Sequence, residues 1–238
     1  MRTNVPGGIH VVASIEEEHV IVGPLGHGEH PENLLARGGF RAEEPVRADL
    51  SDEGSLELAF RVSRASGIRE RLDDVLRDPD IGPDDVGELH QRVAAYAVVT
   101  SERGVLLTQF NEQTHVAGEW GLPGGGLDAG ESPVGGVLRE VWEETGQRVD
   151  LGRLVTIQSQ HWVGRAPNGV IEDFHAVRIV YLAVCPDPHD IVIHDEGGTT
   201  SDARWVRFEE LGDYGLTRAW RRLEALSRLA SEGSHPGP

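Results

Sequence analysis

The chain has 238 residues, with 40 acidic and 22 basic side chains and a formal net charge of −18. This charge argues against a general nucleic-acid-binding surface, because duplex binding depends mainly on Lys and Arg side chains that meet phosphates. Every basic residue is an arginine, so a lysine-dependent phosphate-binding loop is excluded as well.

The single cysteine, Cys185, can form no intramolecular disulfide, which is compatible with a reducing compartment. No N-terminal stretch joins a basic region to an apolar core, and no apolar run approaches the ~20 residues that span a bilayer. We therefore expect a soluble, cytoplasmic protein that has neither a membrane nor a nucleic acid as partner.

The N-terminal third predicts a small α+β region without a recognisable chemistry. Ile9–Ile15 and His19–Val22 are predicted to form a hairpin. A further strand is predicted over Leu56–Val62 and a helix over Ile68–Arg77. Two histidines in Gly26–His30 do not have the spacing of a known ligand pattern, which favours a polar loop there.

A Pro-, Gly- and acid-rich stretch over Asp78–Asp85 predicts a linker. We therefore expect an N-terminal region of unknown role over residues 1–88, a second domain over 89–230, and a disordered tail over 231–238.

The second domain begins with a predicted hairpin, since strand formers over Arg92–Thr100 precede a turn and the apolar Val105–Leu107. After a short strand ending near Trp120 and Leu122, Pro123 and three glycines predict an irregular loop. Beyond the next helix, three further strands are expected, over Leu154–Ser159, Phe174–Val184 and Ala203–Val206. An amphipathic helix over Leu216–Leu229 is expected to close the domain.

A helix over Pro133–Thr145 is the element that carries chemistry. Ser132 offers an N-cap hydroxyl, Pro133 suits the first helical position, and Gly146 is placed as the C-terminal stop. Glu140, Glu143 and Glu144 stand at i, i+3 and i+4, so they converge on one face and repel one another. A bound hard cation would relieve this repulsion, and Mg²⁺ or Mn²⁺ prefers such oxygen ligands.

The span Gly125–Gln147 resembles the Nudix box, which is the signature of MutT-like hydrolases acting on nucleoside diphosphates linked to another moiety. Eight required positions match, and only the final one, normally aliphatic, differs and is Gln147; the matches are Gly125, Glu131, Arg139, Glu140, Val141, Glu143, Glu144 and Gly146. The resemblance implies the family's α/β/α sandwich with a mixed sheet, and Mg²⁺-dependent attack of water on a diphosphate.

By this resemblance, Glu140, Glu143 and Glu144 hold the metal together with the carbonyl of Gly124. Arg139 is expected to orient these carboxylates through bidentate contacts, and Glu131 to organise the box. The alternative reading of the whole group is a solvated acidic helix face.

The resemblance leaves the identity of the general base open, because relatives supply it either from the box or from a downstream loop. We choose Glu196, in the turn-rich Asp195–Gly198, with Glu172, Asp173, Asp202 and Glu144 itself as rivals. Trp162 and Phe174 could stack on a nucleotide base, and Arg165 could contact phosphates. Aromatic residues on strands more often pack in the core, and exposed arginines are more often simply solvated.

The expected function is a Mg²⁺-dependent pyrophosphohydrolase with a nucleotide-type substrate. The alternative is a non-catalytic nucleotide-sensing module in which the N-terminal region carries the output. That region could also form a dimer interface, and we expect a homodimer.

Overall fold

The computed structural model describes residues 1–16, 18–67, 75–166, 169–195, 197–221 and 226. The chain forms two compact units, each built from three segments. Unit 1 consists of Met1–Ala95, Gly126–Pro133 and Thr156–Val180, and unit 2 of Tyr96–Gly125, Val134–Val155 and Tyr181–Pro238. No helix in the described ranges is long and apolar enough to cross a membrane.

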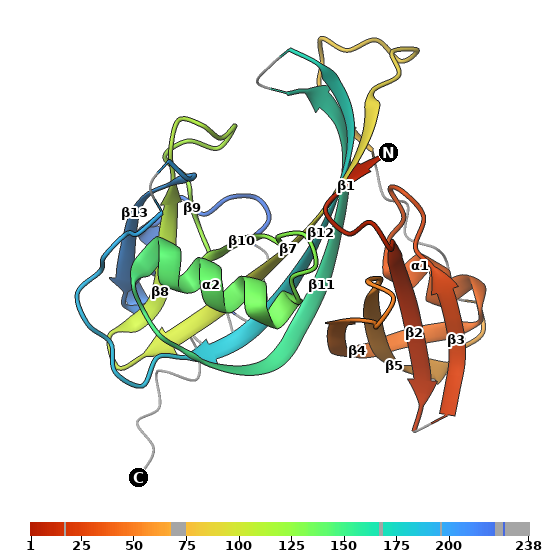
Figure 1. The fold of residues 1–238 in the computed structure, drawn as a ribbon, viewed down its shortest axis with the longest axis horizontal. Coiled ribbons are helices and arrows are strands. Elements are labelled where there is room, and N and C mark those ends of the chain that lie inside the picture. The colour runs from red at the N-terminus through yellow and green to blue at the C-terminus, as the bar shows by residue number, and fades with distance from the viewer. Residues whose placement is uncertain (17, 68–74, 167–168, 196, 222–225, 227–238) are drawn as a thin grey trace. The chain divides into compact units, whose positions relative to one another are not determined.

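Unit 1 contains a four-stranded sheet in the order β3-β2-β5-β4 (Figure 1). The predicted hairpin is confirmed, with β2 (Ile9–Ile15) antiparallel to β3 (Glu18–Pro24). The predicted strand at Leu56 is confirmed as β5 (Leu56–Arg64), which pairs in parallel with β2. Leu56, Leu58 and Phe60 of β5 are buried, so this central strand supplies much of the sheet's core.

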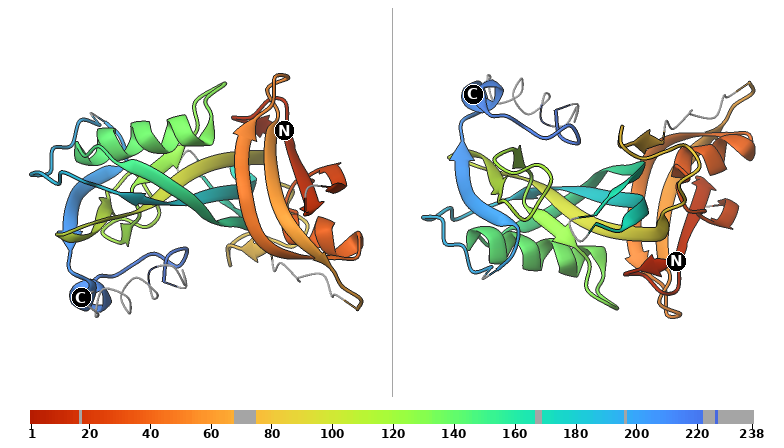
Figure 2. Two further views of the ribbon diagram at one scale, coloured as in Figure 1. Left: turned by 90° about the horizontal axis from the view of Figure 1, so that it is seen from below. Right: turned by 90° about the horizontal axis from the view of Figure 1, so that it is seen from above.

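Two further elements of unit 1 were not predicted, the helix α1 (Pro31–Arg37) and the strand β4 (Phe40–Leu50). The helix begins after His30, whose Nδ1 accepts a hydrogen bond from the backbone N–H of Glu32. β4 is an edge strand with a buried residue near each end and a proline inside, so it lacks regular apolar alternation. Figure 2 shows β4 and β5 as curved strands.

The helix predicted over Ile68–Arg77 is wrong at its end. Leu76–Arg77 forms a short strand, β6, which pairs in parallel with Trp162 and Val163. Pairing with a distant strand outweighs the local helical pattern there. Residues 68–74 lie outside the described ranges.

A second sheet has the order β13-β8-β7-β12-β11-β6 and mixes parallel with antiparallel pairs, which confirms the predicted α/β class with a mixed sheet. Its long strands are β7 (Glu88–Ser101), β11 (Asp150–Arg165) and β12 (Ile171–Val184), each longer than predicted and each contributing residues to both units. β1 (Arg2–Thr3) pairs in parallel with β7.

In unit 2, β7 turns into β8 (Gly104–Phe110) as the predicted hairpin, and β13 (Thr200–Val206) pairs antiparallel with β8. The short strand β9 (Trp120–Gly121) lies beside β8. The glycines expected to form an irregular loop instead make a short strand, β10 (Gly124–Gly126), because β7 offers them a hydrogen-bonding partner.

The predicted box helix is confirmed as α2 (Pro133–Thr145). Val137 and Val141 are buried, whereas Val134, Leu138 and Trp142 on the other side are exposed. In Figure 2, α2 lies along one face of the strands of unit 2. This arrangement fixes which side of α2 meets the strands and which side meets solvent.

The C-terminal helix predicted over Leu216–Leu229 is wrong at its start, where residues 216–221 form an isolated bridge followed by turns; residues 222–225 and 227–229 and the tail over 231–238 lie outside the described ranges. Before it, the 3-10 helix η1 (Phe208–Asp213) follows β13, and Leu216 forms an isolated parallel bridge with Trp120. Cys185 is buried and free, consistent with the expected absence of a disulfide.

Candidate active site

Helix α2 places three glutamates at increasing depth. The side chain of Glu143 is 34% exposed and that of Glu140 is 16% exposed, whereas Glu144 is only 3% exposed as a residue. Glu144 continues the buried stripe of Val137 and Val141 at helical spacing. The helix therefore carries a carboxylate where an apolar side chain would normally pack.

Arg139 connects the two more exposed glutamates. Its Nη1 lies 3.0 Å from Oε1 of Glu140 and 2.9 Å from Oε2 of Glu143. An orienting arginine is expected to make such contacts, and here one nitrogen donates to two carboxylates.

Glu144 is held by different partners. The backbone N–H of Gly124 in β10 donates to its Oε2 at 2.9 Å, and the Thr200 hydroxyl at the start of β13 donates to its Oε1. Sequence reasoning missed Thr200, which is 56 positions from Glu144 and carries no motif. Only the pairing of β13 with β8 brings that hydroxyl to the helix.

Burial dominates the protonation of this group. It raises the pKa of Glu144 to about 8, against the hydrogen bonds from Thr200 and Gly124, which lower it. Burial also raises the pKa of Glu140, although Arg139 opposes the shift and Glu143 reinforces it. Burial thus favours the protonated form of Glu144 at neutral pH.

Two glycines of the box allow close approach of the backbone. A Cβ on Gly125 would lie 2.5 Å from Oε1 of Glu140, so a side chain there would displace that carboxylate. Gly146 adopts a φ of +73° immediately after α2, and a Cβ there would lie 2.9 Å from the carbonyl oxygen of Val192. Backbone N–H groups of His194 and Asp195 donate to the carbonyl of Glu143, so this downstream segment closes the end of the helix.

The remaining box positions have local roles. Oε2 of Glu131 accepts a hydrogen bond from the backbone N–H of Asp128, within the loop before α2. Gln147, which departs from the family pattern, is buried, but its amide is paired with the backbone N–H and carbonyl of His189. A polar side chain is tolerated there because both ends of its amide have hydrogen-bonding partners.

The donor set of three carboxylates suits a hard divalent cation, since three ionised glutamates and one arginine leave two negative charges to be balanced. Among the described residues, however, the three carboxylates are not gathered within 4.8 Å of one another. Arg139 holds two of them and Gly124 with Thr200 holds the third. Shared coordination would therefore require the side chains to shift toward a common ion.

The predicted substrate-binding residues belong to unit 1, whereas the glutamates belong to unit 2. Trp162 and Phe174 stack on each other with ring centroids 4.1 Å apart. Arg165 is exposed and donates to the carbonyl of Gly169 at 2.8 Å. None of these contacts assigns a ligand to the three residues.

The chosen base, Glu196, lies outside the described residues. Of the alternative bases, Asp202 forms an ion pair with Arg204. Oε1 of Glu172 lies 3.6 Å from Nδ1 of His90, and Asp173 accepts hydrogen bonds from two histidines. Glu144 alone is both buried and part of the box.

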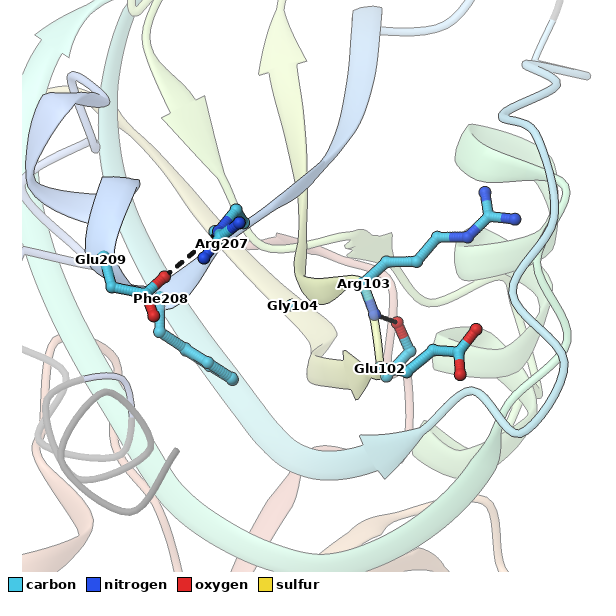
Figure 3. A pocket seen from close by; sticks show the side chains of 7 residues that line it. Glu102, Arg103, Gly104, Arg207, Phe208 and Glu209 are labelled. Atoms are coloured by element: carbon cyan, nitrogen blue, oxygen red, sulfur yellow. Dashed lines mark hydrogen bonds and ion pairs between the residues drawn. The ribbon is translucent and has the colours of Figure 1, made fainter. Parts of the chain in front are cut away.

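An open hollow of about 530 Å³ lies at the turn between β7 and β8 (Figure 3). Its walls come from Ser101–Gly104 and Arg207–Glu209, and they include no residue of the box. We therefore do not assign it to the reaction.

Comparison with known proteins identifies sequences and structures that are similar to this chain. The NUDIX domain family matches residues 90–228. Nucleoside triphosphatase NudI of Salmonella schwarzengrund (strain CVM19633) is 30% identical over 144 residues, which are 59% of this chain and 99% of that protein. NudI of Salmonella newport (strain SL254) is 29% identical with the same coverage. Among solved structures, the MutT protein from Methanosarcina mazei Go1 has 25% sequence identity and a TM-score of 0.46, over 63% of this chain and 100% of that one.

The mixed sheet, the glycine strand and the helix with aligned glutamates define an α/β protein with an acidic candidate site. The chain belongs to the Nudix family, and it is a pyrophosphohydrolase that acts on phosphoanhydride bonds.

Proposed function

We propose that this chain is a Mg²⁺-dependent enzyme that cleaves the diphosphate linkage of a nucleoside triphosphate or of a nucleoside diphosphate derivative, with Mn²⁺ as an alternative cation. The observation that carries the proposal is the complete set of box glutamates on one side of α2, next to β10. The similarity to proteins named nucleoside triphosphatase supports the triphosphate as the first substrate to try.

Glu140, Glu143 and Glu144, with the carbonyl of Gly124, are the proposed metal ligands. Mg²⁺ held by these residues would neutralise charge at the phosphate oxygens and would make a coordinated water easier to deprotonate. The protein keeps the carboxylates in place through Arg139 on one side and through Thr200 on the other. With a pKa of about 8, Glu144 would release its proton when a cation takes that place.

The base that accepts the proton of the attacking water is proposed to be Glu196, with Glu144 as the alternative. Glu144 has the raised pKa of a group that can accept a proton near neutral pH. Glu196 follows directly after Asp195, whose backbone N–H is bonded to α2 through the carbonyl of Glu143. Glu196→Gln distinguishes the two: if Glu196 is the base, this variant should lose activity and keep its metal affinity, whereas it should keep its activity if Glu144 is the base.

Trp162, Phe174 and Arg165 stay candidates for substrate contact, and a cytoplasmic location and a homodimer stay predictions. The chain has no lysine, so any cationic side chain that meets a phosphate must be an arginine. Substrate recognition is expected to depend on residues outside the box, because the proposed role of the box is confined to the diphosphate.

The first prediction tests the proposed chemistry. Purified protein is incubated in Mg²⁺ or Mn²⁺ with nucleoside triphosphates, nucleotide sugars, ADP-ribose and dinucleoside polyphosphates, and released phosphate and nucleotide are measured. Glu144→Gln should lower kcat/KM by at least ~100-fold on the best substrate, because loss of a metal ligand removes several kcal/mol of transition-state stabilisation. Glu112→Gln is the matched control, since Glu112 is exposed in unit 2 and lies outside the box.

Two results would contradict the proposal. One is the absence of turnover for every compound, with nucleotide binding alone detected, which would favour the nucleotide-sensing alternative. The other is an unchanged rate in Glu144→Gln, provided that its circular dichroism spectrum matches that of the unmodified protein.

A further inference from the structure

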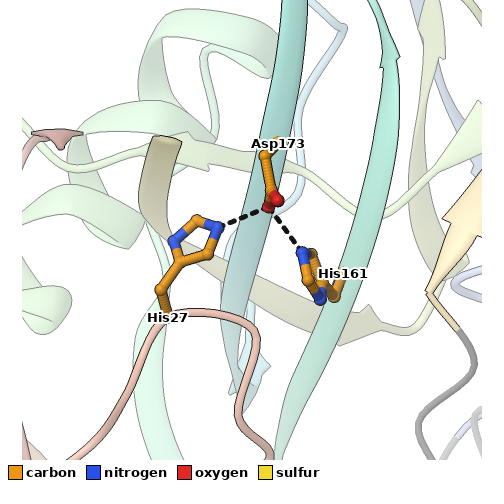
Figure 4. A group of neighbouring side chains, drawn as sticks. All are labelled: His27, His161 and Asp173. Carbon is orange, nitrogen blue, oxygen red and sulfur yellow. Dashed lines mark hydrogen bonds and ion pairs between the residues drawn. The ribbon is translucent and has the colours of Figure 1, made fainter. Parts of the chain in front are cut away.

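Three potential metal ligands meet in unit 1, outside the Nudix box. His27 lies in the loop between β3 and α1, His161 in β11, and Asp173 in β12 (Figure 4). Nε2 of His27 lies 2.7 Å and Nε2 of His161 lies 2.6 Å from the same Oδ1 of Asp173. They are the only three such side chains within the described ranges whose ligand atoms all lie within 4.8 Å of one another.

The loop that carries His27 is built to approach β11 closely. Gly28 adopts a φ of +73°, and a Cβ at this position would lie 2.5 Å from Nδ1 of His161. The next residue, Glu29, accepts a hydrogen bond from the Ser159 hydroxyl at 3.1 Å through its carbonyl oxygen. The loop backbone is therefore fixed against the strand, and His27 with it.

A buried third histidine packs beside the other two. His175 is fully buried, and its ring nitrogens lie 2.9 Å from Gln91 Nε2 and from the Ser159 hydroxyl. Burial and the neighbouring histidines lower the pKa of His175 to about 3, so it is uncharged at neutral pH. Its ring meets that of His27 edge-on at 5.6 Å and that of His161 at 6.5 Å, which limits the positions open to both.

One carboxylate oxygen of Asp173 is the atom on which the group converges, because His27 and His161 both direct Nε2 at its Oδ1. The side chains of the group are 15% to 23% exposed, so water and a small ion can reach them. Nδ1 of His27 is buried and has no hydrogen-bonding partner in the described part of the chain, so Asp173 and ring packing hold this ring.

We propose that His27, His161 and Asp173 bind a late first-row divalent cation, for which Zn²⁺ is the reference, at a site distinct from that of the box glutamates. Two imidazole nitrogens and one carboxylate oxygen favour such a cation over Mg²⁺, which prefers oxygen ligands. Three protein ligands leave a fourth position for water.

The required rearrangement is small. Ligand bonds of about 2.0–2.2 Å in a tetrahedron place neighbouring ligand atoms about 3.3–3.6 Å apart. The nitrogen-to-oxygen separations would thus have to open by roughly 0.6–1.0 Å from their present 2.7 and 2.6 Å. Each imidazole would bind through Nε2 with its proton on Nδ1.

The second prediction is a metal-binding measurement on the full chain after removal of metals with a chelator. Zn²⁺ affinity is measured by competition with a chromophoric chelator, and Co²⁺ is titrated while visible absorption bands of a nitrogen-containing site are recorded. The protein should bind one Zn²⁺ that depends on this group, and His161→Ala should weaken that binding by at least ~100-fold. Asp173→Asn, which keeps the side-chain shape, should also weaken it.

Matched variants separate this site from the box and from incidental histidines. The double variant Glu140→Gln with Glu144→Gln should keep the Zn²⁺ affinity and the Co²⁺ spectrum, and so should His19→Ala, which changes an exposed histidine of the same unit. Zn²⁺ should raise the Tm of these two variants and of the unmodified protein, but not that of Asp173→Asn.

The proposal is overturned if the unmodified protein shows no such Co²⁺ spectrum, or if His161→Ala and Asp173→Asn bind Zn²⁺ as tightly as it does. It is also overturned if the box double variant abolishes the binding, because the ion would then belong to the glutamates. The result does not depend on hydrolase activity, since no substrate is present.

Discussion

Glu144 shows how one residue can serve function at a cost in stability. Its carboxyl is buried where α2 meets the strands, and two hydrogen bonds do not offset the loss of hydration, so its pKa rises to about 8. An apolar residue at this position would pack with Val137 and Val141 without that cost. The retention of an acid there is understandable if the group binds a cation.

The third prediction concerns the pH dependence of stability without metal. In the unfolded chain, Glu144 titrates near 4.5, whereas the folded protein keeps its proton up to about pH 8. Between these values the folded state binds more protons, so the contribution of Glu144 to the free energy of unfolding falls as pH rises. Each pKa unit corresponds to about 1.4 kcal/mol, so the whole fall is a few kcal/mol.

Urea denaturation in the presence of a metal chelator, at several pH values from 4.5 to 8.5, measures this effect. Glu144→Gln should flatten the pH dependence relative to the unmodified protein, and Glu112→Gln should leave it unchanged. Equal pH slopes for Glu144→Gln and the unmodified protein would contradict the assigned burial.

Among the elements of the fold, α2 is the one whose two ends the sequence predicts best. Pro133 starts it and Gly146 ends it at the predicted positions, because a fixed φ suits the first turn and a positive φ stops the helix. The segment Val192–Asp195 then bonds to the carbonyls of Thr145 and Glu143. The end of the helix is therefore determined both by its own sequence and by a downstream segment.

The fourth prediction separates these two contributions. Gly146→Ala should lower the free energy of unfolding by more than the ~1–2 kcal/mol of left-handed strain, because its Cβ would also press on the carbonyl of Val192. Gly130→Ala is the control: Gly130 has a φ of +78°, but a Cβ there meets nothing within 4 Å. Equal losses in the two variants, measured by chemical denaturation, would show that the contact with Val192 contributes nothing.

At the scale of the whole molecule, unit 1 combines the N-terminal residues with segments that belong to the family match. Asn4 donates to the carbonyls of Val93 and Leu127 and accepts from the backbone N–H of Val93. Arg2 and Thr3 pair with His90 and Gln91 of β7. The first residues of the chain thus satisfy backbone groups of β7 that would otherwise be open.

The fifth prediction follows from these bonds. Asn4→Ala should lower the free energy of unfolding by about 1–3 kcal/mol, because it removes three hydrogen bonds between the side-chain amide and the backbone of Val93 and Leu127. Thermal and urea denaturation measure the loss. His19→Ala, at an exposed position of the same unit, should cost less than ~0.5 kcal/mol. An unchanged free energy of unfolding in Asn4→Ala would mean that water replaces the side-chain amide at no cost.

Local patterns predicted the elements whose signals lie within a few residues of one another. The β2–β3 hairpin, β5, the β7–β8 hairpin and α2 all have this property. The missed β4 has few buried residues, and Leu76–Arg77 becomes a strand only by pairing with β11. The division between residues 88 and 89 stays a prediction, while the compact units divide the chain differently.

The sequence by itself determined the family, the box helix and the identity of the acidic residues, because fixed spacings on one helix encode them. Only the tertiary structure decided that Thr200 bonds to Glu144 and that His27, His161 and Asp173 meet. Thr200 and Glu144 are 56 positions apart, and the three members of the histidine–aspartate group lie in one loop and two strands. No local sequence pattern predicts which strands pair. Strand pairing is fixed by long-range burial and backbone hydrogen bonding, which exist only in the folded chain.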